Sequence, residues 1–308
     1  MIIAEALGAA KLFLQNNQAV NANIETPALD AALLLAEILK IDRLKLLLKA
    51  NEEIDADVYA CYQSCLRKRS GGICTAYITG HKEFRYLDLI VTPDVLVPRP
   101  DTETLVDAAL TFIDWCREDA YPAGEQHTPS TCGGVVSVLD LCTGSGAVGL
   151  SLASERNFTD VWASDISQAA LEVARLNAVK NAIDANRIHF AASNFFEGIT
   201  KRFDCIVGNP PYVPSGIIVT LSAEVQNEPH LALDGGTDGL DIITKIIAAS
   251  PQFLNPCGTL LLEADPSQME TIASLMKCAG FCCIKTYRDL AGCTRVIGAR
   301  YRPAHFLQ

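Results

Sequence analysis

The feature that most constrains the fold is a regular alternation of apolar, strand-like runs with helical segments through the second half of the chain. The predicted strands are 135–139, 160–163, 187–191, 203–207, 258–262, 281–287 and 294–300. The predicted helices are 101–115, 147–155, 167–180, 237–250 and 266–279, and a Pro-, Gly-, Ser- and Thr-rich stretch at 118–134 is predicted to be a loop. Continuously apolar strands that alternate with helices indicate an α/β fold, a parallel sheet covered on both faces. Its ligand site should lie beyond the carboxyl ends of the strands.

The residues before this region have a different pattern, which divides the chain into three parts. Residues 1–74 carry apolar side chains at helical spacing and are predicted to form a small helical bundle. Residues 75–97 contain two short β-like runs, 84–87 and 89–91, and are predicted to form a hairpin linker. Residues 98–308 then form the α/β domain.

Composition and charge limit the possible partners and locations. The net charge is −11, and residues 1–74 are nearly neutral, so the acidity belongs to the α/β domain. A protein that binds nucleic acid directly usually presents a basic surface, so we predict no such contact. The 12 cysteines form no C-x-x-C pair, which predicts reduced thiols and no metal site. With no signal peptide and no apolar run of the ~20 residues that span a bilayer, the chain is expected in the cytoplasm and not in a membrane.

A glycine-rich motif follows the first strand of the α/β domain. Gly144, Gly146 and Gly149 fit the G-x-G-x-x-G pattern, and Asp165 ends the next predicted strand. Such a loop lets the backbone approach a nucleoside, and a carboxylate at position 165 could accept hydrogen bonds from both ribose hydroxyls. A nicotinamide dehydrogenase and a methyltransferase would both show this pattern. The acidic Asp140 favours the second, because S-adenosylmethionine is cationic near its sulfur and has no phosphate.

A second motif, Asn209-Pro210-Pro211-Tyr212, follows the strand at 203–207. Two prolines stiffen the loop, so that the Asn209 side chain and the Pro210 carbonyl could each accept one proton of a substrate NH2 group. Tyr212 could stack on a planar amide or base and stabilise a nearby sulfonium. The motif therefore indicates methyl transfer to a planar amino nitrogen, with positioning contributing ~7–11 kcal/mol and no strong base required.

These residues resemble the peptide-chain release factor N5-glutamine methyltransferase family. The tetrapeptide is shared with enzymes that methylate adenine or guanine amino groups, and other stretches select this family. They are Tyr77-Ile78-Thr79-Gly80 with Phe84, Val97-Pro98-Arg99-Pro100-Asp101-Thr102-Glu103, Asn227-Glu228-Pro229, Ala232-Leu233 and Gly235-Gly236-Thr237-Asp238-Gly239-Leu240. The resemblance covers essentially the whole chain. It implies a seven-stranded Rossmann-like class I methyltransferase domain.

The resemblance also implies the roles of individual residues. The cofactor S-adenosylmethionine would bind a loop and several flanking side chains: Asp140, Cys142, Thr143, Gly144, Ser145, Gly146, Asp165, Phe195 and Asn209. Asn209, Pro210 and Tyr212 would be catalytic, and Pro211 would join them in binding the substrate. Cys142 and Asn194 stand where the family often has glycine and aspartate. Arg99 either caps the following helix or contacts the substrate, and Glu228 either forms a turn or shapes the pocket.

The predicted reaction is methylation of the side-chain amide nitrogen of the glutamine in the Gly-Gly-Gln motif of class 1 release factors. The rival prediction, an amino-methyltransferase of adenine or guanine in nucleic acid, would require a basic surface that the α/β domain lacks. Because a tripeptide offers little contact area, we expect residues 1–74 to dock the body of the release factor. The enzyme is predicted to act as a monomer.

Overall fold

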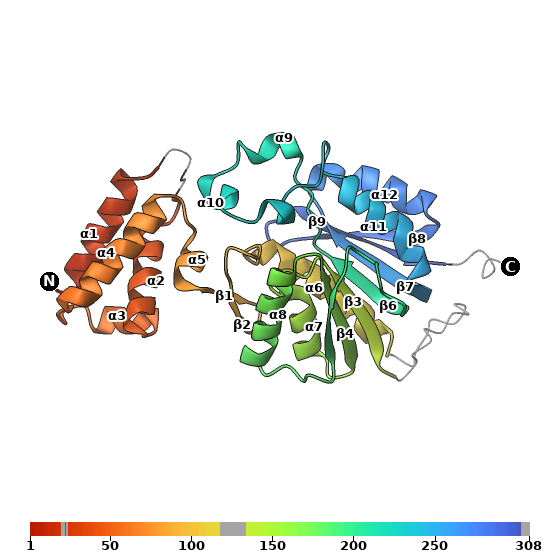
Figure 1. Ribbon diagram of the computed structural model, residues 1–308, viewed down its shortest axis with the longest axis horizontal. Helices are drawn as coiled ribbons and strands as arrows, with labels where there is room; N and C mark the ends of the chain where they lie inside the picture. The colour runs from red at the N-terminus through yellow and green to blue at the C-terminus, as the bar shows by residue number, and fades with distance from the viewer. Residues whose placement is uncertain (20–21, 23, 118–133, 303–308) are drawn as a thin grey trace. The chain divides into compact units, whose positions relative to one another are not determined.

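The computed structural model describes residues 1–19, 22, 24–117 and 134–302, and Figure 1 shows its two compact units. The predicted loop at 118–134 lies, except for its last residue, outside the described residues. The first unit comprises residues 1–81, 91–93 and 219–228, and the second comprises residues 82–90, 94–218 and 229–308.

The first unit is a helical bundle. Its helices are α1 (Ile3–Asn16), α2 (Pro27–Leu39), α3 (Arg43–Leu48), α4 (Ala56–Ser70), α5 (Thr75–Thr79) and α10 (Ala223–Gln226). Fully buried Leu14, Leu35 and Tyr62 form the centre of its core. The buried Arg69 of α4 bonds to Asp30 of α2 at 2.6 Å and to Glu224 of α10 at 2.5 Å. This ion-pair network explains why a segment from far along the chain belongs to this unit.

The second unit is built on a seven-stranded sheet in the order β5-β4-β3-β6-β7-β9-β8. The strands are β3 (Val136–Leu141), β4 (Thr159–Asp165), β5 (Ile188–Ala192), β6 (Phe203–Gly208), β7 (Leu254–Glu263), β8 (Phe281–Arg288) and β9 (Thr294–Tyr301). β9 runs antiparallel to both of its neighbours, and the other pairs are parallel. β3 and β6 are buried at every residue, which is the expected property of continuously apolar central strands.

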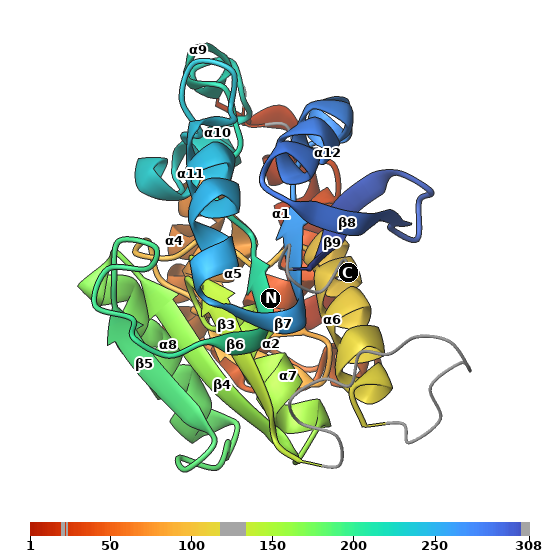
Figure 2. The same cartoon turned by 90° about the vertical axis from the view of Figure 1, so that its right-hand side faces the viewer.

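Helices cover both faces of this sheet, as Figure 2 shows. The helices on one face are α6 (Glu103–Trp115), α7 (Ala147–Glu155) and α8 (Gln168–Lys180), and those on the other are α11 (Asp241–Ala249) and α12 (Met269–Cys278). A hydrophobic cluster fills each interface, with Leu105 and Leu150 in the first and Ile246 and Met276 in the second. The predicted α/β class and the seven-stranded domain are therefore confirmed. The remaining short elements are 3₁₀ helices η1 (Pro100–Thr102), η2 (His230–Ala232), η3 (Ser250–Gln252) and η4 (Pro266–Gln268), with helix α9 (Ser215–Ile218).

The predicted hairpin forms from β1 (His81–Phe84) and β2 (Leu87–Ile90), but its turn lies inside the run that was predicted to be its first strand. Arg85 occupies the turn with a φ of 51°. Its guanidinium group bonds to both oxygens of Glu155 at 2.5 and 2.9 Å and to Asp107 at 2.7 Å. These contacts with α6 and α7 place the turn, and the local sequence does not encode them.

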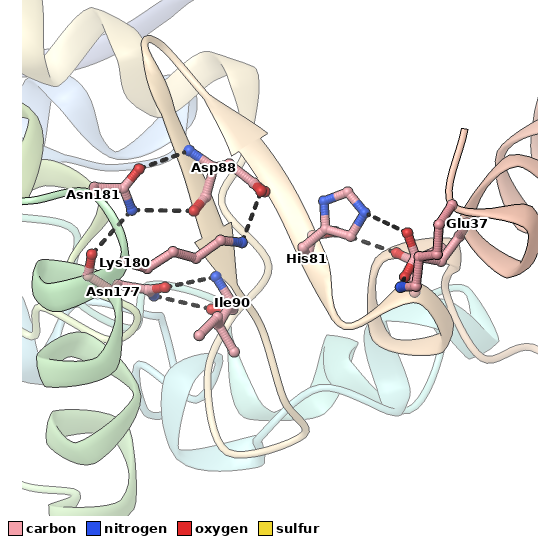
Figure 3. Close-up of polar contacts among 9 residues, drawn as sticks. Glu37, His81, Asp88, Ile90, Asn177, Lys180 and Asn181 are labelled. Atoms are coloured by element: carbon pink, nitrogen blue, oxygen red, sulfur yellow. Dashed lines mark hydrogen bonds and ion pairs between the residues drawn. The ribbon is translucent and has the colours of Figure 1, made fainter. Parts of the chain in front are cut away.

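Within the second unit, Asn177 of α8 and Asn181, the residue just after α8, hold the backbone of β2, as Figure 3 shows. The buried Asn177 accepts a hydrogen bond from the Ile90 amide at 2.6 Å and donates to the Ile90 carbonyl at 3.0 Å. It also donates to the carbonyl of Ser145 at 2.9 Å, in the glycine-rich loop. Asn181 makes the same pair of bonds with the backbone of Asp88, each at 3.1 Å. Figure 3 also shows a contact within the first unit, His81 with Glu37 at 3.4 Å.

Replacing Asn177 with alanine should lower the free energy of unfolding by about 2–3 kcal/mol, because half-buried backbone groups of Ile90 and the buried carbonyl of Ser145 lose their partner. The matched control is Asn181→Ala, which removes the same pair of bonds at a partly exposed position and should cost less than about 1 kcal/mol. Urea denaturation of both variants measures the difference. Equal losses would contradict the assigned role of burial.

Candidate functional site

The glycine-rich loop between β3 and α7 has an unusual backbone. Cys142, Gly144 and Gly146 all have positive φ, at 56°, 55° and 85°. A Cβ atom on Gly146 would lie 2.8 Å from the side chain of Leu150, and one on Gly149 would lie 2.9 Å from the carboxylate of Asp140. Glycine is therefore required at 146 and 149 by close packing, and at 144 by conformation. Cys142 tolerates the left-handed region at a cost of roughly 1–2 kcal/mol.

The Asp140 side chain joins the two ends of this loop by hydrogen bonds. Its Oδ2 accepts hydrogen bonds from the Thr143 hydroxyl at 2.6 Å and from the Gly149 amide at 2.8 Å. The side chain is 1% exposed. Burial raises the pKa of Asp140 to about 7, although the bonds from Thr143 and Gly149 act in the opposite direction. Such a carboxylate is close to half ionised at neutral pH, so a cation beside it would favour its ionised form.

Asp165, the last residue of β4, stands across the loop from Asp140. Its Oδ2 accepts from the Gly144 amide and its Oδ1 from the Ser167 amide, both at 2.9 Å. Burial raises the pKa of Asp165, against these backbone bonds. The Ile166 amide also bonds to this carboxylate, and of the about four lone-pair sites of a carboxylate at least one remains to accept a hydrogen bond from a ligand. A ligand hydroxyl group is a suitable donor for it.

The segment after β5 forms a third wall. Phe195 has a φ of 58°, in the left-handed region that bulky residues avoid. The Ser193 hydroxyl stabilises this turn by bonding to the carbonyls of Phe195 at 3.0 Å and Glu197 at 2.8 Å. Asn194 bonds to Glu197 at 3.0 Å and also lines the cavity.

The tetrapeptide follows β6, and its members point in different directions. The Asn209 Nδ2 donates to the Thr102 hydroxyl at 3.3 Å. The Tyr212 hydroxyl donates to Glu263 at 3.3 Å, and its ring packs against the hydrophobic cluster beneath α11 and α12. Pro210 is buried, whereas Pro211 is half-buried. The tetrapeptide is therefore anchored at both ends by side-chain contacts with other elements.

The glycine-rich stretch at 235–239 packs against the backbone of the tetrapeptide. A Cβ atom on Gly235 would lie 2.8 Å from the Pro211 carbonyl oxygen, and one on Gly239 would overlap the Tyr212 carbonyl oxygen. Gln268 adds a hydrogen bond to that same Tyr212 carbonyl at 3.0 Å. Only glycine allows the two backbone segments to approach so closely.

These walls enclose a cavity of about 730 Å³ within the second unit, a size typical of small-molecule sites. Ten predicted site residues line it: Arg99, Asp140, Cys142, Thr143, Gly144, Ser145, Asp165, Phe195, Asn209 and Pro211. Among the described residues, the lining does not include Gly146, Pro210, Tyr212 or Glu228. Gly146 and Pro210 lie beside lining residues, and the buried Glu228 belongs to the first unit, so its proposed role and the stacking by Tyr212 stay predictions.

Sequence reasoning missed three residues around the cavity. Thr102 lines the cavity and bonds to Asn209. It lies in the stretch 97–103, which carries the family resemblance but predicted no role for Thr102 itself. Lys245 of α11 also lines the cavity. Glu263, at the end of β7, accepts a hydrogen bond from Tyr212 of the tetrapeptide. An acid at the end of an otherwise apolar strand was the available signal for Glu263.

In the part of the chain that the structure describes, no three His, Cys, Asp or Glu side chains gather as metal ligands would. None of the helices in these described ranges is both long enough and apolar enough to span a bilayer.

Comparisons with known proteins agree on the type of protein. Residues 5–80 match the family described as PrmC N-terminal domain, and residues 130–228 match the methyltransferase small domain. The chain is 38% identical to the release factor glutamine methyltransferase of Burkholderia pseudomallei, over 89% of this chain and 92% of that protein. It is 35% identical to the enzyme of the same name from Agrobacterium fabrum, over 96% of this chain and 98% of that protein.

Among solved structures, the chain is similar to a 16S rRNA methyltransferase of T. Thermophilus in complex with AdoMet and guanosine. The TM-score is 0.50 at 19% identity, over 72% of this chain and 50% of that one. Identity at this level shows a shared fold alone.

The Gly239→Ala variant should lower the free energy of unfolding by about 2 kcal/mol more than Gly280→Ala. Both glycines have positive φ, 77° and 85°, so alanine is strained at either position. A Cβ atom at 280 has nothing within 4 Å, whereas one at 239 overlaps the Tyr212 carbonyl. Thermal unfolding of the two variants separates the cost of the steric overlap at position 239 from the cost of the backbone strain at both positions. Similar losses would show that the tetrapeptide backbone moves aside without cost.

Proposed function

Because this chain belongs to the release factor glutamine methyltransferase family, we propose that it methylates the side-chain amide nitrogen of the Gly-Gly-Gln glutamine in class 1 release factors. It is a methyltransferase of the S-adenosylmethionine-dependent class. The observation that carries the substrate proposal is that Asn209 of the tetrapeptide lines the same cavity as Asp140 and Asp165 of the glycine-rich site.

The residues of the cavity fit S-adenosylmethionine. The loop at 142–146 brings backbone close to the ligand, the remaining acceptor capacity of Asp165 suits a ribose hydroxyl, and Asp140 suits a cation. Phe195 supplies an apolar ring for the adenine. When bound, S-adenosylmethionine supplies an electrophilic methyl group on a positively charged sulfur.

Asn209 positions the nucleophile in this proposal. Because its Nδ2 donates to Thr102, its Oδ1 is the atom left to accept a proton from the substrate amide. The Pro210 carbonyl accepts the other proton. Bonding both N–H groups fixes the plane of the amide and favours electron density on nitrogen as it attacks, so the rate comes from alignment and electrostatics. The product amide then releases its extra proton to water.

The proposed function is tested by incubating the protein with radiolabelled S-adenosylmethionine and, in parallel, a purified class 1 release factor, transfer RNA or DNA. We expect label in the release factor alone, at the Gly-Gly-Gln glutamine, and no label when that glutamine is replaced by alanine. Label in nucleic acid and none in the release factor would establish the rival amino-methyltransferase function.

Asn209→Ala should reduce the single-turnover rate of methyl transfer by about 100-fold or more, because an oriented acceptor for the substrate amide is lost. Binding of S-adenosylmethionine, measured by calorimetry, should change much less. A rate within a few-fold of the wild type would remove Asn209 from the proposed mechanism.

Affinity for S-adenosylmethionine should rise about tenfold between pH 6 and pH 8. The pKa of Asp140 is raised to about 7, so the carboxylate is mostly protonated at pH 6 and mostly ionised at pH 8, and only the ionised form attracts a cation. Calorimetric titrations across this range measure the effect, and Asp140→Asn should flatten it. An affinity that is constant from pH 6 to pH 8 would exclude this role.

We also propose that the first unit docks the body of the release factor. Its short helix α3 presents three leucines to solvent, with basic side chains between and beside them. They are Leu44, Leu47 and Leu48, which are 67%, 71% and 86% exposed, with Arg43, Lys45 and Lys49. An exposed apolar patch of this kind usually marks a protein contact.

Replacing both Leu47 and Leu48 with aspartate should raise the KM for intact release factor by about tenfold. The rate on a short Gly-Gly-Gln peptide should not change, because the cavity that takes the glutamine belongs to the other unit. Leu12→Asp, at a leucine of α1 that is 58% exposed, is the matched control. Equal effects on the protein and the peptide would contradict docking by α3.

A further inference from the structure

Glu263 is a buried carboxylate that the proposed reaction has not used so far. It is the last residue of β7 and is 2% exposed. In the parallel pairing of β6 with β7, Gly208 lies opposite Leu262, so the next residues, Asn209 and Glu263, lie at the same level at this edge of the sheet. Glu263 therefore lies directly behind the tetrapeptide.

Two hydroxyl groups of the site contact this carboxylate. The Tyr212 hydroxyl donates to its Oε1 at 3.3 Å. Thr102 also hydrogen-bonds to it, and both contacts lower the pKa of Glu263, while burial is the larger effect and raises it to about 7. Its Oε2 has no hydrogen-bond partner among the described residues. A buried and incompletely bonded carboxylate costs stability, so its presence calls for another reason.

The direction of the hydrogen bonds gives that reason. In its ionised form, which predominates above pH 7, the carboxylate only accepts, and a threonine hydroxyl has a single hydrogen to donate. If the Thr102 hydrogen points to Glu263, the Thr102 oxygen can only accept from Asn209. The Asn209 carboxamide must then turn its NH2 group toward Thr102, as the 3.3 Å contact between Nδ2 and Oγ1 shows, and keep its Oδ1 for the cavity.

We propose that Glu263 is a positioning residue that fixes the orientation of the Asn209 carboxamide through Thr102. This inference rests on the proposed function, in which the Asn209 oxygen accepts a proton of the substrate amide. An inverted carboxamide would present its NH2 group to the substrate NH2 group, and two donors repel each other. The carboxylate thus determines that Asn209 recognises an amino group, which is the specificity the reaction needs.

The test begins with Glu263→Gln, which keeps the shape of the side chain and adds a donor. Glutamine can donate to Thr102, whose hydrogen then turns to Asn209 and favours the inverted carboxamide. We expect kcat on the release factor to fall by about 10- to 100-fold. The KM for the release factor, the affinity for S-adenosylmethionine and the melting temperature should stay close to those of the wild type. Asp204→Asn is the control, since Asp204 is a buried acid of β6 that bonds to Ser137, and it should leave kcat unchanged.

Variants of Thr102 then test whether Glu263 acts on Asn209 through the Thr102 hydroxyl. Thr102→Val removes the hydroxyl and should reduce kcat as Glu263→Gln does, whereas Thr102→Ser keeps the hydroxyl and should restore it. The double variant Glu263→Gln with Thr102→Val should be no slower than Thr102→Val alone, because both changes act on one path.

Multiplied effects in the double variant would overturn the inference, and so would a loss in Glu263→Gln that appears only as weaker folding or weaker cofactor binding. Failure of the proposed function would look different. The wild type itself would then transfer no label to the release factor.

Discussion

The parallel pairing of β3 with both of its neighbours is the constraint on which the site depends. In the registers, Leu141 of β3 lies opposite Ser164 of β4 and Gly208 of β6. The loops that follow these three strands therefore begin at one edge and at one height. The loop after β3 brings the glycine-rich turn, the end of β4 brings Asp165, and the loop after β6 brings Asn209. No flexible element has to move these groups together, so their relative positions are set when the sheet forms.

Local motifs were predictable from the sequence because local backbone geometry demands particular residues. Glycine is required at 144, 146 and 149 by a positive φ or by close packing. The tetrapeptide follows a strand that is apolar at almost every position. The order of strands and helices was predictable for the same reason, since continuous burial leaves a continuous apolar run. For these features, chain neighbours alone carry the necessary information.

The residues that were missed depend on contacts between distant parts of the chain. Thr102 meets Asn209 across 107 positions, Asn177 meets Ile90 across 87, and Arg69 meets Glu224 across 155. The residues around Thr102 and Asn177 do not reveal these contacts, because the contacts arise from the packing of a helix against a strand end. The hairpin turn at Arg85 is another example, since ion pairs with two helices, and not its own β propensity, decide where the chain reverses.

Two buried acids of the second unit, Asp140 and Glu263, lower its stability at neutral pH. The pKa values of Asp140 and Glu263 are both raised to about 7, above ordinary values of 3.8 and 4.5. The folded state then binds protons more tightly than the unfolded state, so their contribution to stability falls as the pH rises from about 4 to 7. At neutral pH the free protein bears this cost. In the proposed function, a cationic cofactor would offset this cost at Asp140 by stabilising the ionised form, so part of its binding energy would arise from relief of an unfavourable buried charge. Beside Glu263, Arg295 lowers the pKa but is outweighed by burial, and the remaining cost serves the proposed hydrogen-bond direction that Glu263 imposes on Thr102 and Asn209.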